Sequence, residues 1–397
     1  MDKDFIYLNS NDGSGLIGVG DKSHLIFDAK SDLEELDDFV RNHKGEYIFF
    51  SLSYDLKNKF EDLESKNEDN IDFPLAILWC PEYVLEQKED ELTFLKGESK
   101  EVILGKVLDF LKEEDNAFRI EKPLKARTSK EGYLNNVRQL KNELQYGNIY
   151  EVNYCQEFFA EDVVVDNANA LYHKVNKLTK APFSCYWNFK DHIVISGSPE
   201  RFIRKTGSKL ISQPIKGTIK RGKNDAEDKE LVQQLKNDPK ERAENVMIVD
   251  LVRNDLSRIA TKGSVSVEEL FGIYTFETVH QMISTIACVI EPDLKFSELL
   301  RALFPMGSMT GAPKVSAMNL IEKHEDFKRG IYSGSIGYMD PKGDFDMNVI
   351  IRSLVYSKKN KYLSCSVGGA ITIQSIPESE YEECFTKVNA ILTGIRE

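Results

Sequence analysis

The first 120 residues alternate short apolar runs with polar loops and charged stretches of helical pattern. The runs EYIFFSLSYDL and FPLAILWCPEYVL predict β-strands, whereas SDLEELDDFV predicts a helix. The charge-rich stretch KNKFEDLESKNEDNID predicts a solvated surface loop over residues 57–72. We therefore expect a β-rich N-terminal part covering residues 1–120.

A second region begins near Pro123 and opens with a helix. Thr128 to Glu131 has the form of a capping box, in which a hydroxyl residue precedes a glutamate by three positions. Gly147 is expected to end this helix. Its apolar face consists of Tyr133, Val137, Leu140 and Leu144.

The rest of the chain, residues 126–397, alternates strand-like runs with two longer helices. IYEVNYCQEFF, HIVISGSPERFI and KLISQPIKGTI predict strands. One helix is expected from about Pro239 to Ile259, with Asp238 as its N-cap, and a last one from about Pro377 to Leu392. Because strands and helices follow one another without a regular βαβ rhythm, the pattern predicts an α+β fold.

Composition narrows the class of protein. A hydrophobic content of 41% with 29% charged residues is typical of a soluble globular chain, and the net charge of −13 argues against nucleic acid or an anionic membrane as partner. Apolar runs stay short of the roughly 18–20 residues that span a bilayer. The start MDKDFIYLNS lacks the apolar segment of a secretory signal, so a cytoplasmic location is expected. The six cysteines are scattered and are expected to be reduced.

Several polar residues stand where chemistry is plausible, each with a structural alternative. Residues 214–222, PIKGTIKRG, suggest a strand that ends in a glycine-rich turn open to a ligand, or else a basic hairpin tip on the surface. Glu244 lies on the apolar face of its helix, as a metal ligand or as the partner of Arg253 or Arg258. Glu380 and Glu383 share a helix face, although Glu383 also forms an ordinary surface pair with a lysine four residues later.

Three further features remain open on the residues alone. His280 sits among apolar neighbours and fits a satisfied core residue as well as a catalyst. Residues 307–314 form a glycine-rich turn that enters a helix, which suits an anion but lacks the nucleotide-binding Walker pattern. Arg352 is a charge inside the apolar strand NVIIRSLV, where a bidentate carboxylate partner is expected.

Seven strings together resemble the chorismate-binding family that includes anthranilate, aminodeoxychorismate, and isochorismate or salicylate synthases. They occur in the family's order and are SGSPERF, PIKGTIKRG, ERAENVMIVDLVRNDLSRI, FPMGSMTGAPK, RGIYSGSIGY, NVIIRS and SVGGAITIQSIPESEYEE. The resemblance implies an α+β fold in which two packed sheets and their helices surround one cleft. It also implies a Mg²⁺ ion that bridges protein carboxylates and the substrate.

The resemblance assigns roles residue by residue. Glu244 and Glu383 are the implied direct metal ligands, and Glu380 assists through water. Glu200 is the implied general acid/base, and His280 supports departure of the leaving hydroxyl. The implied substrate contacts are Tyr332, Arg352, Gly217, Thr218, Thr310 and a turn at Gly368 and Gly369.

Lys216 decides which reaction of the family is expected. Anthranilate synthases typically carry a small residue there, whereas aminodeoxychorismate synthases carry a lysine that attacks the ring and is displaced by ammonia. At a pKa near 10.4 only about 0.1% of the amine is neutral near neutral pH, so the site is expected to lower that pKa. The resemblance therefore favours amination of chorismate to 4-amino-4-deoxychorismate, on the route to 4-aminobenzoate.

Departures from the family pattern are few. Ala370 replaces a glycine, Gln374 an acidic residue and Glu157 an arginine. The LLES and NPSPY-type segments that bind feedback tryptophan are not found, and APFSCYWNF over residues 181–189 matches poorly. This difference favours the folate branch over the tryptophan branch.

A partner is implied by the same resemblance. The chain has no G-x-C-x-G-x-Q nucleophile motif, so a separate glutamine amidotransferase subunit is expected to supply ammonia. Two alternatives stay open: an anthranilate or isochorismate synthase, and a non-catalytic chorismate-binding subunit.

Overall fold

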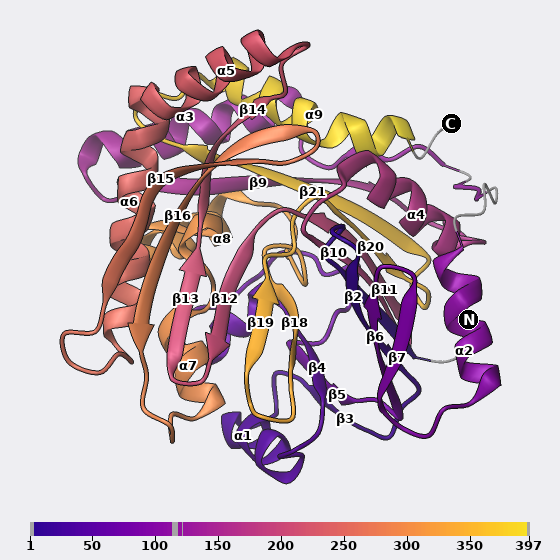
Figure 1. The fold of residues 1–397 in the computed structure, drawn as a ribbon. Helices are drawn as coiled ribbons and strands as arrows, with labels where there is room; N and C mark the ends of the chain where they lie inside the picture. The colour runs from indigo at the N-terminus through magenta and orange to yellow at the C-terminus, as the bar shows by residue number, and fades with distance from the viewer. Residues whose placement is uncertain (1–3, 113–117, 121, 395–397) are drawn as a thin grey trace.

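The computed structural model describes residues 4–112, 118–120 and 122–394 (Figure 1). In these ranges the chain forms two large antiparallel sheets with helices packed on their outer faces. The helices are α1 (Leu33–Asn42), α2 (Glu101–Leu111), α3 (Lys130–Tyr146), α4 (Ala168–Thr179), α5 (Asp225–Asn237), α6 (Pro239–Ser257), α7 (Phe296–Leu303), α8 (Lys314–His324) and α9 (Pro377–Gly394), with 3₁₀ helices η1 (Tyr54–Lys59) and η2 (Gly307–Met309).

The first sheet has 11 strands, in the order β17-β9-β21-β20-β11-β10-β1-β2-β6-β7, with β8 paired to β9. Its strands are β1 (Phe5–Asn9), β2 (Ser14–Val19), β6 (Tyr83–Lys88), β7 (Glu91–Lys96), β8 (Lys125–Ala126), β9 (Glu151–Ala160), β10 (Phe183–Phe189), β11 (His192–Ser198), β17 (Gly311–Ala312), β20 (Ser353–Ser357) and β21 (Tyr362–Ile371). Helices α3, α4, α8 and α9 contact this sheet, and Figure 1 shows α3 and α9 side by side.

The second sheet has 10 strands, in the order β14-β16-β13-β12-β19-β18-β4-β5-β3, with β15 paired to β16. Its strands are β3 (Ser23–Phe27), β4 (Ile48–Leu52), β5 (Ala76–Cys80), β12 (Arg201–Thr206), β13 (Lys209–Gln213), β14 (Ile215–Lys220), β15 (Ser266–Thr275), β16 (Val279–Val289), β18 (Ser335–Met339) and β19 (Phe345–Asn348). Helix α6 lies against β14 and β16.

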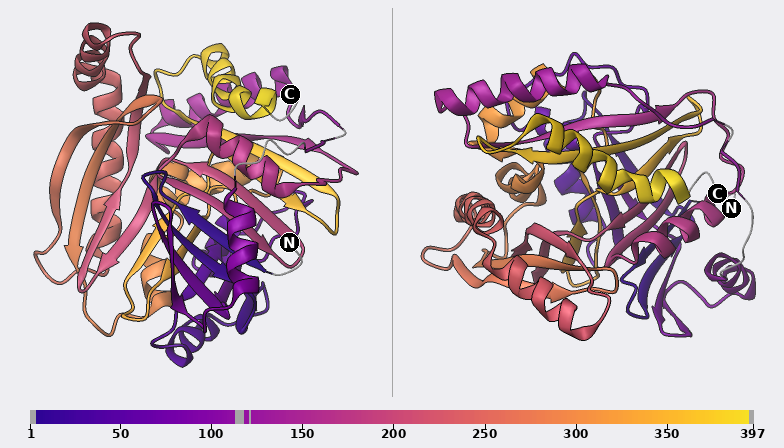
Figure 2. Two further views of the ribbon diagram at one scale, coloured as in Figure 1. Left: turned by 45° about the vertical axis from the view of Figure 1, so that its right-hand side comes forward. Right: turned by 90° about the horizontal axis from the view of Figure 1, so that it is seen from above.

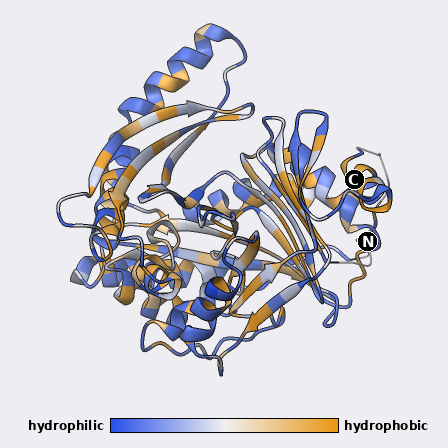
Figure 3. Ribbon diagram, turned by 60° about the horizontal axis from the view of Figure 1, so that its bottom comes forward, coloured by the Kyte–Doolittle hydropathy of each residue, from blue (hydrophilic) through white to orange (hydrophobic). Residues whose placement is uncertain are grey.

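The core lies on both faces of each sheet. One cluster joins the first sheet to α3, α4 and α9, and a second joins the second sheet to α1, α6 and α7. A third cluster takes Ile6 and Trp187 from the first sheet and Phe49 and Trp79 from the second, so it holds the two sheets together. In Figure 3, hydrophobic residues alternate with hydrophilic ones along many strands, whereas the peripheral loops are mainly hydrophilic. The α+β fold with two packed sheets is confirmed.

The N-terminal strands are shared between the sheets. Strands β1, β2, β6 and β7 extend the first sheet, whereas β3, β4 and β5 extend the second. Figure 2 shows these indigo and violet strands lying beside strands from later parts of the chain. Strands within residues 5–96 and strands within residues 125–371 therefore belong to the same two sheets.

The expected helices form with small shifts at their ends. Helix α3 begins after Ser129, whose side chain accepts a hydrogen bond from Gly132 N, so the N-cap lies one residue later than the capping box suggested. Gly147 ends the helix with φ +80°, and all four residues of the expected apolar face are buried. In α6 the Asp238 side chain accepts from the backbone of Lys240 and Glu241, as expected of an N-cap.

Three expectations from sequence pattern are wrong in detail. The stretch over residues 57–72 is not solvated throughout, because Lys57 is 0% exposed and pairs with Glu322 at 2.7 Å. The run HIVISGSPERFI is not one strand: β11 belongs to the first sheet and β12 to the second. NVIIRSLV divides in the same way, because β19 ends at Asn348 and β20 begins at Ser353.

Candidate functional site

The two sheets meet through an ion pair near one end of each strand order. Lys216 comes from β14 of the second sheet, and Glu151 comes from β9 of the first. The Lys216 Nζ atom lies 2.6 Å from Glu151 Oε1, and the two residues are 9% and 1% exposed. Lys216 is therefore a buried residue in a strand and not part of a surface hairpin tip.

A break in regular pairing accompanies Lys216. The register between β14 and β16 shifts between Ile215 and Thr218, as in a β-bulge, and Gly217 has φ +91°. A β-carbon at Gly217 would also lie 3.1 Å from Glu241 Oε2. Thr218 is exposed on the same strand. The residues that we expected to form a turn thus form a bulged strand that packs on α6.

The charges around Lys216 act against the lowered pKa that the sequence suggested. Burial alone lowers the pKa of Lys216, but the carboxylates of Glu151, Glu244 and Glu200 outweigh it and raise that pKa above its ordinary value. The expectation of a depressed pKa is therefore wrong for the protein without ligands. A cation or a protonated carboxyl beside the amine is needed to reverse the direction.

Glu200 and Arg352 lie where the chain crosses between the sheets. Glu200 is in the segment from β11 to β12, and Arg352 is in the segment from β19 to β20. The two crossings are joined by hydrogen bonds from Gly197 N to Arg352 O at 3.0 Å and from Val349 N to Glu200 O at 3.0 Å. This arrangement explains why two polar residues interrupt apolar runs.

Glu200 is poised to exchange a proton near neutral pH. Burial raises its pKa to about 7, against a hydrogen bond from Ser308 Oγ to Glu200 Oε1 at 2.7 Å and the charges of Lys216 and Arg352. The side chain is 5% exposed. A carboxyl in this state suits general acid/base catalysis.

Arg352 presents a cation without the carboxylate partner that we expected. Its φ of +50° places it in the left-handed region, and burial lowers the pKa of its guanidinium, which Glu200 partly offsets. Among the described residues the guanidinium donates no hydrogen bond to a side chain or backbone carbonyl. Its planar donors are thus free to bind a ligand carboxylate. Tyr332, expected beside it, is 4% exposed, and burial raises the pKa of its phenol well above the ordinary value.

An acidic cluster, formed by Glu244 of α6 and by Glu380 and Glu383 of α9, lies between these two helices. Burial raises the pKa of Glu244 to about 7, and it also raises that of Glu380, which is 5% exposed. For Glu383, the charges of Lys387, at 2.7 Å, and Lys240 outweigh burial and lower the pKa. Within the cluster, Glu383 is the more exposed of the two α9 carboxylates, because its side chain is 48% exposed.

The fit of this cluster to a divalent cation can be judged from its chemistry. Within the described ranges, no three His, Cys, Asp or Glu side chains are already arranged to hold a metal. Lys240 lies 3.8 Å from Glu244, and its pKa is raised by the charges of Glu244, Glu380 and Glu383, against burial. The ammonium groups of Lys240 and Lys387 are thus shared among three carboxylates, and carboxylate oxygens are the ligands that Mg²⁺ prefers. The residues present fit a hard cation.

His280 takes part in a different network. Its Nε2 and Nδ1 atoms lie 2.9 Å from Asp228 Oδ1 and from Thr275 Oγ1, respectively. Asp228 in turn accepts hydrogen bonds from Arg221 and from Gly222 N. The imidazole, 1% exposed, therefore connects α5 to β15, and its catalytic role stays a prediction.

Gly368 and Gly369 lie inside β21, not in a turn. They pair with Cys155 and Tyr154 of β9. A β-carbon at Gly368 would lie 2.4 Å from Cys155 Sγ, whereas at Gly369 the nearest atom, Glu380 Oε2, would be 3.5 Å away. Thr310, 0% exposed, precedes β17, and its carbonyl accepts a hydrogen bond from Asn153 N of β9.

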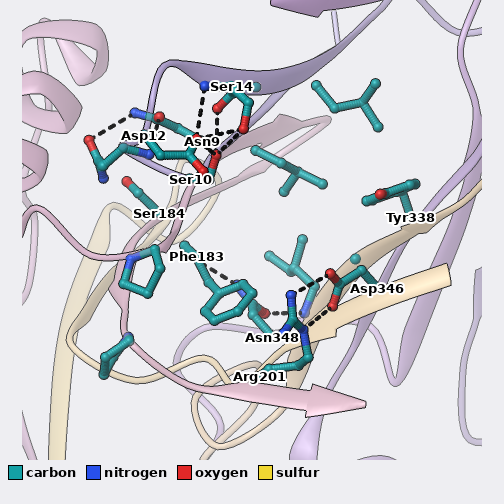
Figure 4. Close-up of a pocket in the computed structure, with 18 of the residues that line it drawn as sticks. Asn9, Ser10, Asp12, Ser14, Phe183, Ser184, Arg201, Tyr338, Asp346 and Asn348 are labelled. Atoms are coloured by element: carbon teal, nitrogen blue, oxygen red, sulfur yellow. Dashed lines mark hydrogen bonds and ion pairs between the residues drawn. The ribbon is translucent and has the colours of Figure 1, made fainter. Parts of the chain in front are cut away.

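A separate cavity of about 890 Å³ lies between the sheets (Figure 4). Arg201 and Asp346 form a bidentate pair in its wall, with Nε to Oδ1 at 2.8 Å and a second bond from the terminal nitrogen to Oδ2 at 3.0 Å. Pro182, Phe183 and Ser184 also line it. The segment that matches the feedback-site pattern poorly therefore still borders a cavity.

Glu151 is the site residue that the sequence pattern did not reveal. It opens β9, in which all ten residues are buried, so a carboxylate in that run was the available signal.

No helix within the described ranges is both long and apolar enough to cross a membrane.

Comparison with known proteins gives a consistent set of similarities. Residues 3–393 match the family model described as chorismate binding enzyme. Aminodeoxychorismate synthase component 1 from Klebsiella aerogenes is 36% identical over 343 residues, covering 86% of this chain and 75% of the relative. The protein of the same name from Escherichia coli is 37% identical over 345 residues, with the same coverage of 86% and 75%.

Solved structures agree on the fold. Anthranilate synthase component I from Streptococcus pneumoniae superposes with a TM-score of 0.81 at 25% identity, covering 96% of this chain and 92% of that one. A menaquinone-specific isochorismate synthase from Escherichia coli gives a TM-score of 0.78 at 19% identity, covering 99% and 88%.

Proposed function

Because the chain belongs to the chorismate-binding enzyme family, we propose that it converts chorismate and ammonia to 4-amino-4-deoxychorismate and water. The observation that carries the proposal is the buried amine of Lys216 between the two sheets, beside Glu200 and Glu244. The relatives named aminodeoxychorismate synthase component 1 support the same reaction.

Lys216 acts first, as a nucleophile. Its neutral amine attacks a ring carbon of chorismate, a C–N bond forms, the ring double bonds shift, and the C4 hydroxyl leaves. Ammonia then adds at C4 and gives up one proton, which restores the protonated Glu200 carboxyl, while Lys216 leaves with its electron pair and is regenerated. The balance is one chorismate and one ammonia consumed, and one aminated product and one water released.

Glu200 supplies the proton for the leaving hydroxyl. With a pKa of about 7, a large fraction of this carboxyl is protonated at neutral pH, although its ordinary value is 4.5. Ser308 fixes the carboxyl through its hydrogen bond to Oε1. Departure as water avoids the release of free hydroxide into a buried site.

Arg352 binds the charged substrate directly, and the acidic cluster would bind it through a Mg²⁺ ion. The unpartnered Arg352 guanidinium accommodates one substrate carboxylate, and Tyr332 is proposed as a second donor to it. Glu244 and Glu383 would hold Mg²⁺ directly, and Glu380 through water. When bound there, Mg²⁺ supplies positive charge that offsets these carboxylates and the dianionic substrate. The bound ring is proposed to lie against Gly217, Thr218, Thr310, Gly368 and Gly369. His280 is proposed to support departure of the C4 hydroxyl.

A separate glutamine amidotransferase subunit is proposed to deliver the ammonia. Two observations support this partner: the relatives are named component 1, and the sequence of this chain contains no amidotransferase nucleophile motif. Free ammonium should therefore replace glutamine in assays of this chain alone.

Product analysis tests the proposal. Purified protein is incubated with chorismate, Mg²⁺ and ammonium, and the products are separated before and after treatment with a lyase that releases 4-aminobenzoate. We expect 4-aminobenzoate, its loss in Lys216→Ala and on chelation of the metal, and its retention in Lys220→Ala, which changes an exposed lysine of the same strand. Formation of anthranilate or isochorismate by the wild-type protein contradicts the proposal, as does the absence of turnover at saturating ammonium.

A further inference from the structure

We propose that Glu151 is the positioning residue of Lys216, holding its amine between the sheets in the orientation that attacks the substrate. The inference rests on the proposed function and adds a residue from the opposite sheet. Strand β9 would thus take part in the reaction through a side chain, in addition to its structural role.

The contact is short, buried and exclusive. Glu151 Oε1 lies 2.6 Å from Lys216 Nζ, and within the described ranges the second oxygen, Oε2, is buried without any hydrogen-bond partner. A buried carboxylate with one unsatisfied oxygen is costly, and an ion pair of this kind adds little net stability. The arrangement is therefore better explained by what it does to the lysine.

The backbone of Glu151 is fixed independently of this contact. Strand β17 pairs with β9, with Ala312 opposite Glu151, and Tyr150 N donates to Ala312 O at 2.7 Å. A β-carbon on Gly311 would lie 2.2 Å from Glu151 O, so only glycine allows this close approach. A carboxylate on a fixed backbone can restrict a long, flexible lysine side chain.

Glu151 also raises the pKa of the Lys216 amine and so affects the pH at which that amine becomes neutral. Five carboxylates interact electrostatically with the Lys216 amine, and they come from four elements. They are Glu151 of β9, Glu200 of the β11–β12 crossing, Glu241 and Glu244 of α6, and Glu383 of α9. Only Glu151 among them is hydrogen-bonded to the amine. Replacing its charge with an amide keeps an acceptor oxygen for orientation and lowers the pKa of Lys216.

The test compares Glu151→Gln with Glu151→Ala. Lys216 is labelled with acetic anhydride over a range of pH and quantified by peptide mass spectrometry, which requires no substrate. In E151Q we expect the pH of half-maximal labelling to fall by about one unit or more, because an adjacent charge is lost. With chorismate, Mg²⁺ and ammonium, we expect kcat within a few-fold of wild type for E151Q and a loss of about 10- to 100-fold for E151A, since only the latter loses the orienting hydrogen bond.

Glu322→Gln is the matched control. Glu322 forms a similar pair with buried Lys57 at 2.7 Å and also has an unpartnered oxygen, Oε2, but it lies on α8 away from Lys216. E322Q should leave both the labelling of Lys216 and kcat as in wild type, and the melting temperature of each variant reports any unfolding.

Three outcomes overturn the inference: unchanged Lys216 labelling in E151Q, equal loss of kcat in E151Q and E151A, or full kcat in folded E151A. The labelling readout separates this inference from the proposed function, because a wild-type protein that makes no aminated product would refute the function while the labelling still tests the contact.

Discussion

Replacing Glu200 with glutamine removes a buried carboxyl while keeping its shape. Burial raises the pKa of Glu200 from an ordinary 4.5 to about 7, and a difference of about 2.5 in pKa corresponds to about 3 kcal/mol. Between these values the folded protein retains a proton that the unfolded chain has released. The stability of the wild-type protein therefore falls as the pH rises from 4.5 to 7, and the E200Q variant lacks this loss.

We expect the free energy of unfolding of E200Q, relative to wild type, to increase by about 3 kcal/mol between about pH 4 and pH 9. Urea unfolding followed by circular dichroism, with ligand-free protein, measures this difference at each pH. Taking the difference between variant and wild type cancels the other buried carboxyls, including Glu244. The same variant should lose the aminating activity, because an amide cannot supply the proton.

The control is Glu378→Gln, which changes a carboxyl whose side chain is 57% exposed and pairs with Arg138 on the surface. Its effect on stability should be below about 1 kcal/mol at every pH. A difference between E200Q and wild type that does not change with pH would refute the reasoning, since it would show that Glu200 is as readily ionised in the folded protein as in the unfolded chain.

Three further predictions follow from single contacts. Ser308→Ala removes the hydrogen bond that favours ionised Glu200, so the alkaline limb of kcat should move to higher pH by about one unit, as measured in a pH profile. Arg352→Lys should raise the KM for chorismate about tenfold or more with little change in melting temperature, because an ammonium cannot bind a carboxylate bidentately. Gly368→Ala should lower the free energy of unfolding, measured with urea, by about 1–3 kcal/mol, because its β-carbon would lie 2.4 Å from a thiol sulfur. Gly369→Ala, whose β-carbon would have its nearest contact at 3.5 Å, should stay within about 0.5 kcal/mol of wild type.

Local pattern predicted the elements that carry the acidic cluster. The N-cap at Asp238 defines the start of α6 without reference to the rest of the chain, and it is observed. Glu244 stands out from that pattern because a carboxylate on an apolar face needs a partner. For these residues the information lies within one or two turns of helix.

The crossings between sheets could not be predicted in this way. The runs that contain Glu200 and Arg352 are apolar on both sides, because each run is buried before and after it changes sheet. Periodicity reports burial but does not report which sheet a strand joins. The contact between Glu151 and Lys216 depends on residues 65 positions apart in different sheets, so only the assembled fold brings them together.

The direction in which the pKa of Lys216 shifts could not be predicted from the sequence either, because the charges that set it come from distant parts of the chain. A lysine inside a buried strand suggests a lowered pKa through loss of solvation, which is the only local effect. The opposing carboxylates come from β9, α6 and the β11–β12 crossing, and their sum reverses the direction. The resemblance to a family singled out Lys216 as the residue that decides the reaction, and that role stays a prediction, but the resemblance did not reveal the raised pKa of its amine in the protein without ligands.

The most direct test of covalent catalysis by Lys216 is peptide mass spectrometry of the protein incubated with chorismate and Mg²⁺ in the absence of ammonium. We expect a covalent adduct on Lys216 with the mass of chorismate less one water, which disappears when ammonium is added as 4-amino-4-deoxychorismate forms. Formation of that product by Lys216→Ala at the wild-type rate, with no adduct on the wild-type protein, would contradict covalent catalysis by Lys216.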